Sequence, residues 1–175
     1  MPTIVHGFDW PERLVVGTVG RPGERAFYLQ ARDGKRVTSV ALEKEQSAVL
    51  ADKVAELLDE VATVEDNRFS VPPAAPSELR DAAPLDQPVE PEFRAGALSL
   101  GFDPATAQVV IEAYPIEDEL EIVTETDEDG DEVEAVVEMP EPAEVFQVKI
   151  PVGSARAFVE RTREVVAAGR RPGDA

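Results

Sequence analysis

The chain has 175 residues, no cysteine and a formal net charge of −19. The absence of cysteine excludes disulfides, thiolate metal sites and cysteine nucleophiles, and the negative charge disfavours phosphate-rich partners such as nucleic acid. No apolar run approaches the roughly 20 residues of a membrane-spanning helix, and the first ten residues lack the pattern of a signal peptide. We therefore expect one domain, residues 1–175, in a cytoplasmic protein without a membrane-spanning segment.

Three short apolar segments follow a lead-in that ends at Pro11. They are predicted strands at 14–19, 27–31 and 37–42. The first two are separated by the turn sequence GRPG (20–23) and the last two by Asp33-Gly34, a dipeptide typical of tight hairpins. Because these connections are short, we expect the strands to pair antiparallel.

A helix of about 20 residues is predicted to begin at Glu43. Glu43 and Glu45 suit its positive end, where the helix dipole favours acidic side chains. Its apolar stripe comprises Val49, Leu50, Val54, Leu57, Leu58 and Val61. The three strands and this helix make a strand–strand–strand–helix unit over 12–62.

Residues 63–91 contain six prolines and no strand or helix periodicity, so we interpret them as a long connector. After it, the order of apolar segments recurs. RAGALSLG (94–101) parallels RLVVGTVG (13–20), and VVIEAY (109–114), VFQVKI (145–150) and a helix from Pro151 to about Ala168 follow. The sequence thus predicts a second unit over 92–170.

The predicted fold is α+β, with two tandem strand–strand–strand–helix units in a pseudo-twofold arrangement. Each unit would contain its own antiparallel sheet, covered on one face by its helix. Tandem units of this kind look like the single-stranded nucleic-acid binders of the PUR and Whirly type, a likeness of fold alone. An aromatic content of 6% and the net charge of −19 disfavour that function.

The second unit contains an acidic insertion at 115–143. From Glu117 to Glu144 there are 14 acidic residues and no Lys or Arg. The β-rich segments EIVTET (121–126) and EVEAVV (132–137) flank Asp129-Gly130, which predicts a protruding acidic β-hairpin. The acidic run from Asp127 superficially resembles a calcium loop, but the sixth position, which requires glycine, is a glutamate.

Three stretches resemble the actinobacterial family known as domain of unknown function 3090. They are ERLVVGTVGRPGERAFYLQARDGKRVTSVALEKEQSAVLADKVAELLDEV (12–61), PLDQPVEPEFRAGALSLGFD (84–103) and VVAAGRRP (165–172). The resemblance implies a bacterial cytoplasmic protein and brings no established activity. It also implies a later Cys/His motif of zinc-ribbon type, which this chain lacks. Natural loss and removal of a tail both remain open, and no metal ligand is carried over.

Five basic residues cluster around the first two turns: Arg21, Arg25, Arg32, Lys35 and Arg36. These residues favour an interpretation as strand-edge charge that discourages aggregation. The alternative is that Arg25, with Tyr28 and Gln30, lines a site for an anion or nucleotide, because the planar guanidinium suits phosphate and carboxylate. His6 is the only histidine, and no motif gives it a Ser or Cys partner. We predict no catalytic residue, no metal ligand and no cofactor.

These observations favour a non-enzymatic binding or adaptor protein with a protein partner. The acidic hairpin would dock a basic partner, although a charged segment that only keeps the protein soluble remains open. One alternative is a binder of a small anionic ligand or single-stranded nucleic acid through Arg25, Tyr28 and Gln30. The other is an enzyme without a recognisable motif, since no GxSxG, HExxH or phosphate-loop sequence occurs.

Overall fold

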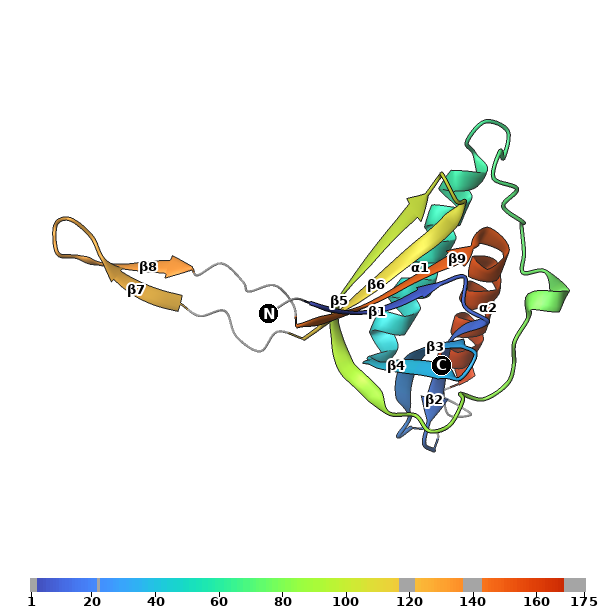
Figure 1. Cartoon of the computed structure of the whole chain (residues 1–175), viewed down its shortest axis with the longest axis horizontal. Helices are drawn as coiled ribbons and strands as arrows, with labels where there is room; N and C mark the ends of the chain where they lie inside the picture. The colour runs from blue at the N-terminus through green and yellow to red at the C-terminus, as the bar shows by residue number, and fades with distance from the viewer. Residues whose placement is uncertain (1–2, 22, 117–121, 137–142, 169–175) are drawn as a thin grey trace.

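A computed structural model describes residues 3–21, 23–116, 122–136 and 143–168. Seven strands form one mixed sheet in the order β1-β9-β6-β5-β4-β3-β2 (Figure 1). These strands are β1 (Ile4–Asp9), β2 (Arg13–Val19), β3 (Ala26–Asp33), β4 (Arg36–Leu42), β5 (Pro91–Asp103), β6 (Gln108–Pro115) and β9 (Glu144–Pro151). The helices are α1 (Lys44–Ala62), α2 (Val152–Ala168) and the short 3-10 helix η1 (Ser77–Leu79).

The expected pair of tandem units, each with its own antiparallel sheet, is wrong. All seven strands belong to one sheet, because β4 pairs parallel with β5 and β1 pairs parallel with β9. Residues 4–9, which the sequence suggested were a lead-in, supply β1. A short turn dictates antiparallel pairing only for the two strands that it joins, whereas β4 and β5 are separated by α1 and the connector.

Strand β5 has 13 residues and changes partner along its length. Its first residues pair with β4, and the segment from Leu98 to Asp103 pairs with β6. The sheet is also bent, because β1 and β2 lie at opposite edges but are joined by only residues 10–12. Three residues span at most about 10 Å, so the two edges approach one another there.

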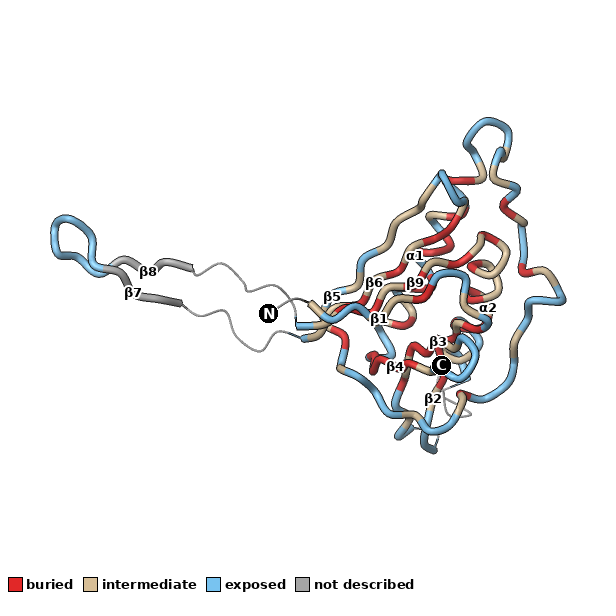
Figure 2. Tube along the Cα trace, viewed as in Figure 1, coloured by how far each residue is buried: buried red, intermediate tan, exposed pale blue. Residues whose placement is uncertain are grey.

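The apolar core lies between the sheet and the two helices, which pack on each other (Figure 2). Alternate residues of β6 and β9 face it in register, with Val109 beside Ile150 and Ile111 beside Val148. Most of the apolar stripe of α1 is buried, as helical periodicity predicted, although Val49 is exposed. Glu43 caps α1 in a capping box with Gln46.

Residues 63–90 form an extended connector that is largely exposed but anchored at intervals (Figure 2). Val71, Ala75 and Leu85 are its buried apolar side chains. Helix α2 holds its first part, because Arg156 donates a hydrogen bond to the carbonyl of Pro72 and Glu160 accepts one from the amide of Ala75. The proline-rich connector is therefore anchored to the rest of the protein at several points.

Strands β7 (Ile122–Thr126) and β8 (Glu132–Val136) form a second, two-stranded antiparallel sheet. This hairpin lies within the acidic insertion, and it projects away from the seven-stranded sheet (Figure 1). Residues 117–121 and 137–142, which the prediction included in the insertion, lie outside the described residues.

Candidate functional site

A pocket of about 390 Å³ lies where β4 ends and α1 begins. Its wall combines the turn before β3, the first half of β3, the end of β4, the N-terminus of α1 and the first half of β5. The polar lining side chains are Arg25, Tyr28, Glu43, Lys44 and Arg94. These elements meet there because β5 pairs parallel with the end of β4 and brings Arg94 beside Ala41.

The strand register explains the space at Tyr28. This side chain lies between two small residues, Gly17 on β2 and Ala41 on β4. On the β2 side, the Leu85 side chain of the connector occupies the space above Gly17, since a Cβ atom added to Gly17 would lie 2.5 Å from it. On the β4 side, the small Ala41 and Arg94 of β5 line the pocket.

The pocket is positively charged in a molecule that is strongly negative. Three cationic side chains face one carboxylate, Glu43, which gives the lining a formal charge of 3 − 1 = +2. Arg94 donates a hydrogen bond of 2.6 Å to Glu43. The side chains of Arg25, Tyr28 and Lys44 form no hydrogen bond or ion pair with the residues that the structure describes. Their donors are available for an oxyanion.

The structure places two of the three predicted site residues together. Arg25 and Tyr28 line the pocket, whereas Gln30 lies two residues further along β3 and is only 1% exposed. The Gln30 amide donates to the Ser39 hydroxyl and to the Asp86 carbonyl, and its oxygen accepts from the Asp86 amide. Gln30 therefore holds the connector on the sheet and lies outside the pocket.

A group of ion pairs holds the same part of the connector. Arg13, only 8% exposed, donates to Asp81 at 2.6 Å and to Asp86 at 3.0 Å. Burial alone would raise the pKa of both carboxyls, but the hydrogen bonds from Arg13 and the charges of the neighbouring arginines together outweigh it and lower both pKa values. Carboxylates that stay ionised in ion pairs suit a structural role better than proton transfer.

Helix α2 adds a further arginine to this group. The Arg161 guanidinium donates to the Val16 carbonyl at 3.0 Å and to the Asp81 carbonyl at 2.8 Å. The Val16 carbonyl lies on β2, the last strand of the sheet, so the bond satisfies part of an otherwise unpaired edge. Burial lowers the pKa of Arg161.

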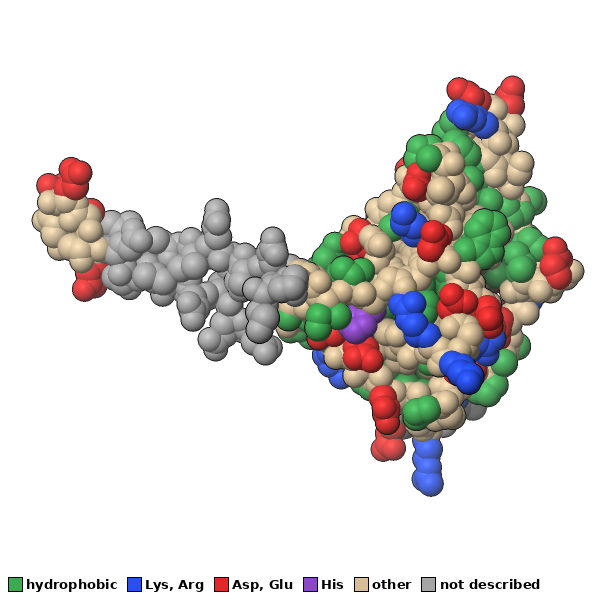
Figure 3. All heavy atoms as spheres, in the orientation of Figure 1, with side chains coloured by type: hydrophobic (Ala, Val, Ile, Leu, Met, Phe, Trp, Pro, Cys, Tyr) green, Lys and Arg blue, Asp and Glu red, His purple; other side chains and the backbone are tan. Residues whose placement is uncertain are grey.

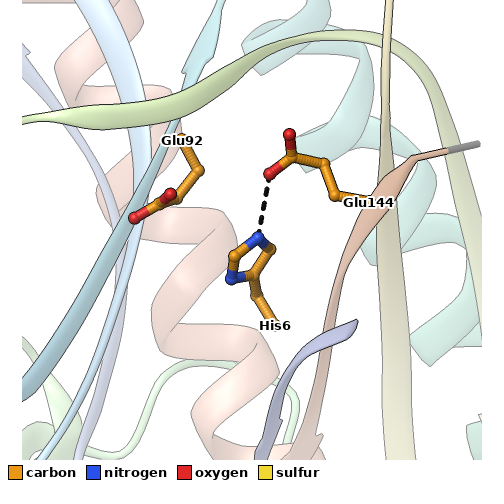
Figure 4. A group of neighbouring side chains, drawn as sticks. All are labelled: His6, Glu92 and Glu144. Atoms are coloured by element: carbon orange, nitrogen blue, oxygen red, sulfur yellow. Dashed lines mark hydrogen bonds and ion pairs between the residues drawn. The ribbon is translucent and has the colours of Figure 1, made fainter. Parts of the chain in front are cut away.

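A second cluster of polar side chains comes from three strands. His6 on β1 and Glu144 on β9 form a hydrogen bond of 2.9 Å between Nε2 and Oε1. Glu92 on β5 lies beside them, and one ligand atom from each residue lies within 4.8 Å of the other two (Figure 4). The sequence analysis missed this group, because only the parallel pairing of β1 with β9 brings residues 6 and 144 together.

The hairpin tip is a third polar feature. The residues from Asp127 to Glu132 are all exposed, and acidic side chains gather at the end of the projection (Figure 3). The Asp127 carboxylate accepts hydrogen bonds from the amides of Asp129 and Asp131 and so closes the turn. Gly130 supplies the positive φ of 82° that the turn needs.

Comparisons with known proteins agree with the resemblance inferred from the sequence. The family described as "Protein of unknown function (DUF3090)" matches residues 6–174. No curated protein and no solved structure gives a match. Among the residues that the structure describes, neither α1 nor α2 has the length and apolar character to cross a membrane.

Proposed function

We propose that this chain, which belongs to the DUF3090 family of proteins of unknown function, is a non-enzymatic cytoplasmic adaptor that binds a basic protein partner. The placement of the acidic hairpin supports this proposal. Strands β7 and β8 form a sheet of their own, away from the body (Figure 1). Successive carboxylates at Asp127, Glu128 and Asp129 are exposed at its tip.

Dense negative charge on a projecting element attracts a basic partner before the two molecules touch. It attracts a basic surface over a distance of about one Debye length, roughly 8 Å at physiological salt, and so speeds association. A two-stranded hairpin is only marginally stable alone in water. A partner that packs on β7 and β8 would therefore supply both the opposite charge and the missing packing.

The test compares the full chain with a variant that lacks residues 117–143. Strands β6 and β9 are antiparallel neighbours, with Ala113 beside Phe146, so a short glycine-rich turn can join Ile116 to Glu144. In a quantitative pull-down from native lysate, we expect the full chain to capture a basic protein at low salt and the variant to lose it. Equal recovery of the same proteins by both chains would refute the adaptor function.

A second variant separates charge from shape. It neutralises the tip with Glu128→Gln, Asp129→Asn, Asp131→Asn and Glu132→Gln, and it retains Asp127, which closes the turn. Capture is expected to fall strongly although the hairpin remains. Undiminished capture would show that the partner recognises the hairpin by something other than its charge.

The pocket supports a second proposal, that the protein binds a small anionic ligand. The available donors of Arg25, Lys44 and Tyr28 carry this proposal. A pocket of about 390 Å³ fits one phosphate- or carboxylate-bearing small molecule. A long single-stranded nucleic acid is disfavoured, because the remaining surface of a chain with net charge −19 would repel it.

Calorimetric titration with inorganic phosphate, a nucleoside triphosphate and a dicarboxylate tests the pocket. A hydrogen bond to a charged group contributes about 1.5–3 kcal/mol, so Arg25→Ala is expected to weaken binding by roughly ten- to a hundredfold. Lys35→Ala is the matched control, because Lys35 is an exposed cation outside the pocket. Equal effects of the two substitutions would indicate diffuse charge attraction instead of a site.

A further inference from the structure

We propose that His6, Glu92 and Glu144 bind a divalent first-row transition metal ion. The imidazole nitrogen and the two carboxylates come from β1, β5 and β9, and they converge although up to 138 residues separate them in the chain. Figure 4 shows both carboxylates beside the histidine ring. This assignment is independent of the hairpin and of the Arg25 pocket.

The distances suit a shared ion after a small adjustment. Transition metals bind histidine nitrogen and carboxylate oxygen at about 2.0–2.2 Å, so two ligand atoms on one ion lie about 3 Å apart. His6 Nε2 and Glu144 Oε1 are already 2.9 Å apart. A ligand oxygen of Glu92 lies within 4.8 Å of these two atoms and must move closer to share the ion. Because the Glu92 side chain is exposed, it has room to rotate toward them.

The backbone holds two of the ligands in place. Parallel pairing aligns His6 with Phe146, two residues beyond Glu144 on the same side of β9. The Ile4 amide also donates to the Ala143 carbonyl at 2.9 Å. The side chains of His6 and Glu144 are 19% and 27% exposed, so water reaches both ligand groups only partly. Ligands fixed by strand pairing lose little conformational freedom when an ion binds.

The charges of the group favour a cation. Two carboxylates lie beside a single imidazole, and among the described residues no Lys or Arg forms an ion pair with either of them. A divalent ion would neutralise both. The field of a molecule with net charge −19 also concentrates cations near its surface.

The donor set indicates the class of metal. An imidazole nitrogen favours zinc, copper, iron or nickel over calcium, magnesium and manganese, which suit oxygen ligands. Zinc is expected to bind more tightly than manganese, following the general affinity order of divalent ions. Three protein ligands leave coordination positions open for water or for a group from another molecule.

Binding of Zn²⁺ to the metal-free full chain tests the proposal. Titration in excess Mg²⁺ suppresses diffuse binding to exposed carboxylates, and one Zn²⁺ per chain is expected to remain. Co²⁺ gives an independent readout, because a four-coordinate Co²⁺ ion absorbs visible light much more strongly than the hydrated ion. His6→Ala and Glu92→Gln are each expected to weaken Zn²⁺ binding at least tenfold, in line with losses of about 10–100-fold from outer-shell changes.

Two controls keep the result decisive. Glu90→Gln removes an exposed carboxylate two residues before Glu92, and it should leave Zn²⁺ affinity unchanged. Glu92→Gln should preserve the fold, since Glu92 is exposed, so its loss of binding could not be attributed to unfolding. Zn²⁺ affinity that is the same in His6→Ala, Glu92→Gln and the unaltered chain would overturn the proposal. Affinity that disappears on removal of residues 117–143 while His6→Ala leaves it unchanged would overturn it equally.

Discussion

Gln30 and Arg13 hold the connector to the sheet with side chains that have almost no exposed surface. Gln30 bonds both backbone groups of Asp86, and Arg13 bonds the carboxylates of Asp81 and Asp86. The structure describes no buried side-chain nitrogen or oxygen without a hydrogen-bond partner. Each bond therefore matters mainly through the polar group that its removal would leave unpaired.

Replacement of Gln30 by alanine is expected to destabilise the protein by about 1–3 kcal/mol, the cost of leaving buried polar groups unpaired. Three partner groups lose a bond: the Ser39 hydroxyl and the amide and carbonyl of Asp86. Urea unfolding measures the change. Gln147→Ala is the control, because Gln147 is half-buried and the described contacts give its side chain no hydrogen bond. Equal midpoints for the two variants would contradict the structural role of Gln30.

The ion pairs of Asp86 predict a loss of stability in acid. Burial acts to raise the pKa of Asp86, but the hydrogen bonds and the charge attraction of Arg13 and Arg32 together outweigh it and hold this pKa below the ordinary aspartate value. A lowered pKa in the folded state adds stability above the unfolded pKa, about 3.9, and this stability disappears as the pH falls through the folded pKa. Asp86→Asn should be less stable than the unaltered chain at neutral pH.

The difference between the two chains should shrink as the pH is lowered below about 4, because protonation removes the same charge from the unaltered chain. Urea unfolding at several pH values measures it. The backbone bonds of Asp86 to Gln30 are retained in Asp86→Asn, so the comparison isolates the carboxylate. A stability difference that does not change with pH would show that the ion pairs contribute nothing.

At the scale of elements, the connector depends on one close contact with the sheet. Leu85 is buried against Gly17 of β2, at a place where any larger residue would collide with it. Arg156 and Glu160 of α2 hold an earlier part of the same connector. A long proline-rich segment thus behaves as part of the body, since its anchors are spread along its length.

Gly17→Ala is expected to destabilise the protein by about 1–3 kcal/mol, the usual cost of overpacking a buried site. The added Cβ atom would lie 2.5 Å from Leu85, which must then shift. Leu85→Ala removes the collision, so the double variant should lose less stability than the sum of the two single variants. Chemical unfolding of all four chains gives the coupling energy. Strict additivity would show that Gly17 and Leu85 do not contact each other.

Local sequence patterns predicted the individual strands and helices better than the way in which the strands pair. Asp33-Gly34 and the GRPG turn indicated antiparallel neighbours, and β2, β3 and β4 pair in that way. The parallel pairs could not be predicted, since no turn joins β4 to β5 or β1 to β9. For the same reason the basic cluster around the first turns suggested Arg25 and Tyr28 but not Lys44 or Arg94.

At the scale of the whole molecule, most of the net charge belongs to a segment that does not form the core. Residues 117–143 contain 13 of the 36 acidic residues and no basic residue, so their removal changes the net charge from −19 to −6. The hairpin within this segment pairs in its own sheet, while the core forms between the seven-stranded sheet and the helices. Most of the charge therefore resides where it affects encounters with other molecules more than folding.

Removal of residues 117–143 is expected to leave the free energy of unfolding within about 0.5 kcal/mol of its original value, the range for changes away from buried contacts. Strands β6 and β9 are already paired beside the point of removal, so a short turn preserves their register. Thermal and urea unfolding at physiological salt measure the effect. A large loss of stability would show that the hairpin stabilises the rest of the protein. Lost partner binding would then have two explanations, unfolding and the missing hairpin. With stability unchanged, that loss would locate the docking surface on the hairpin itself.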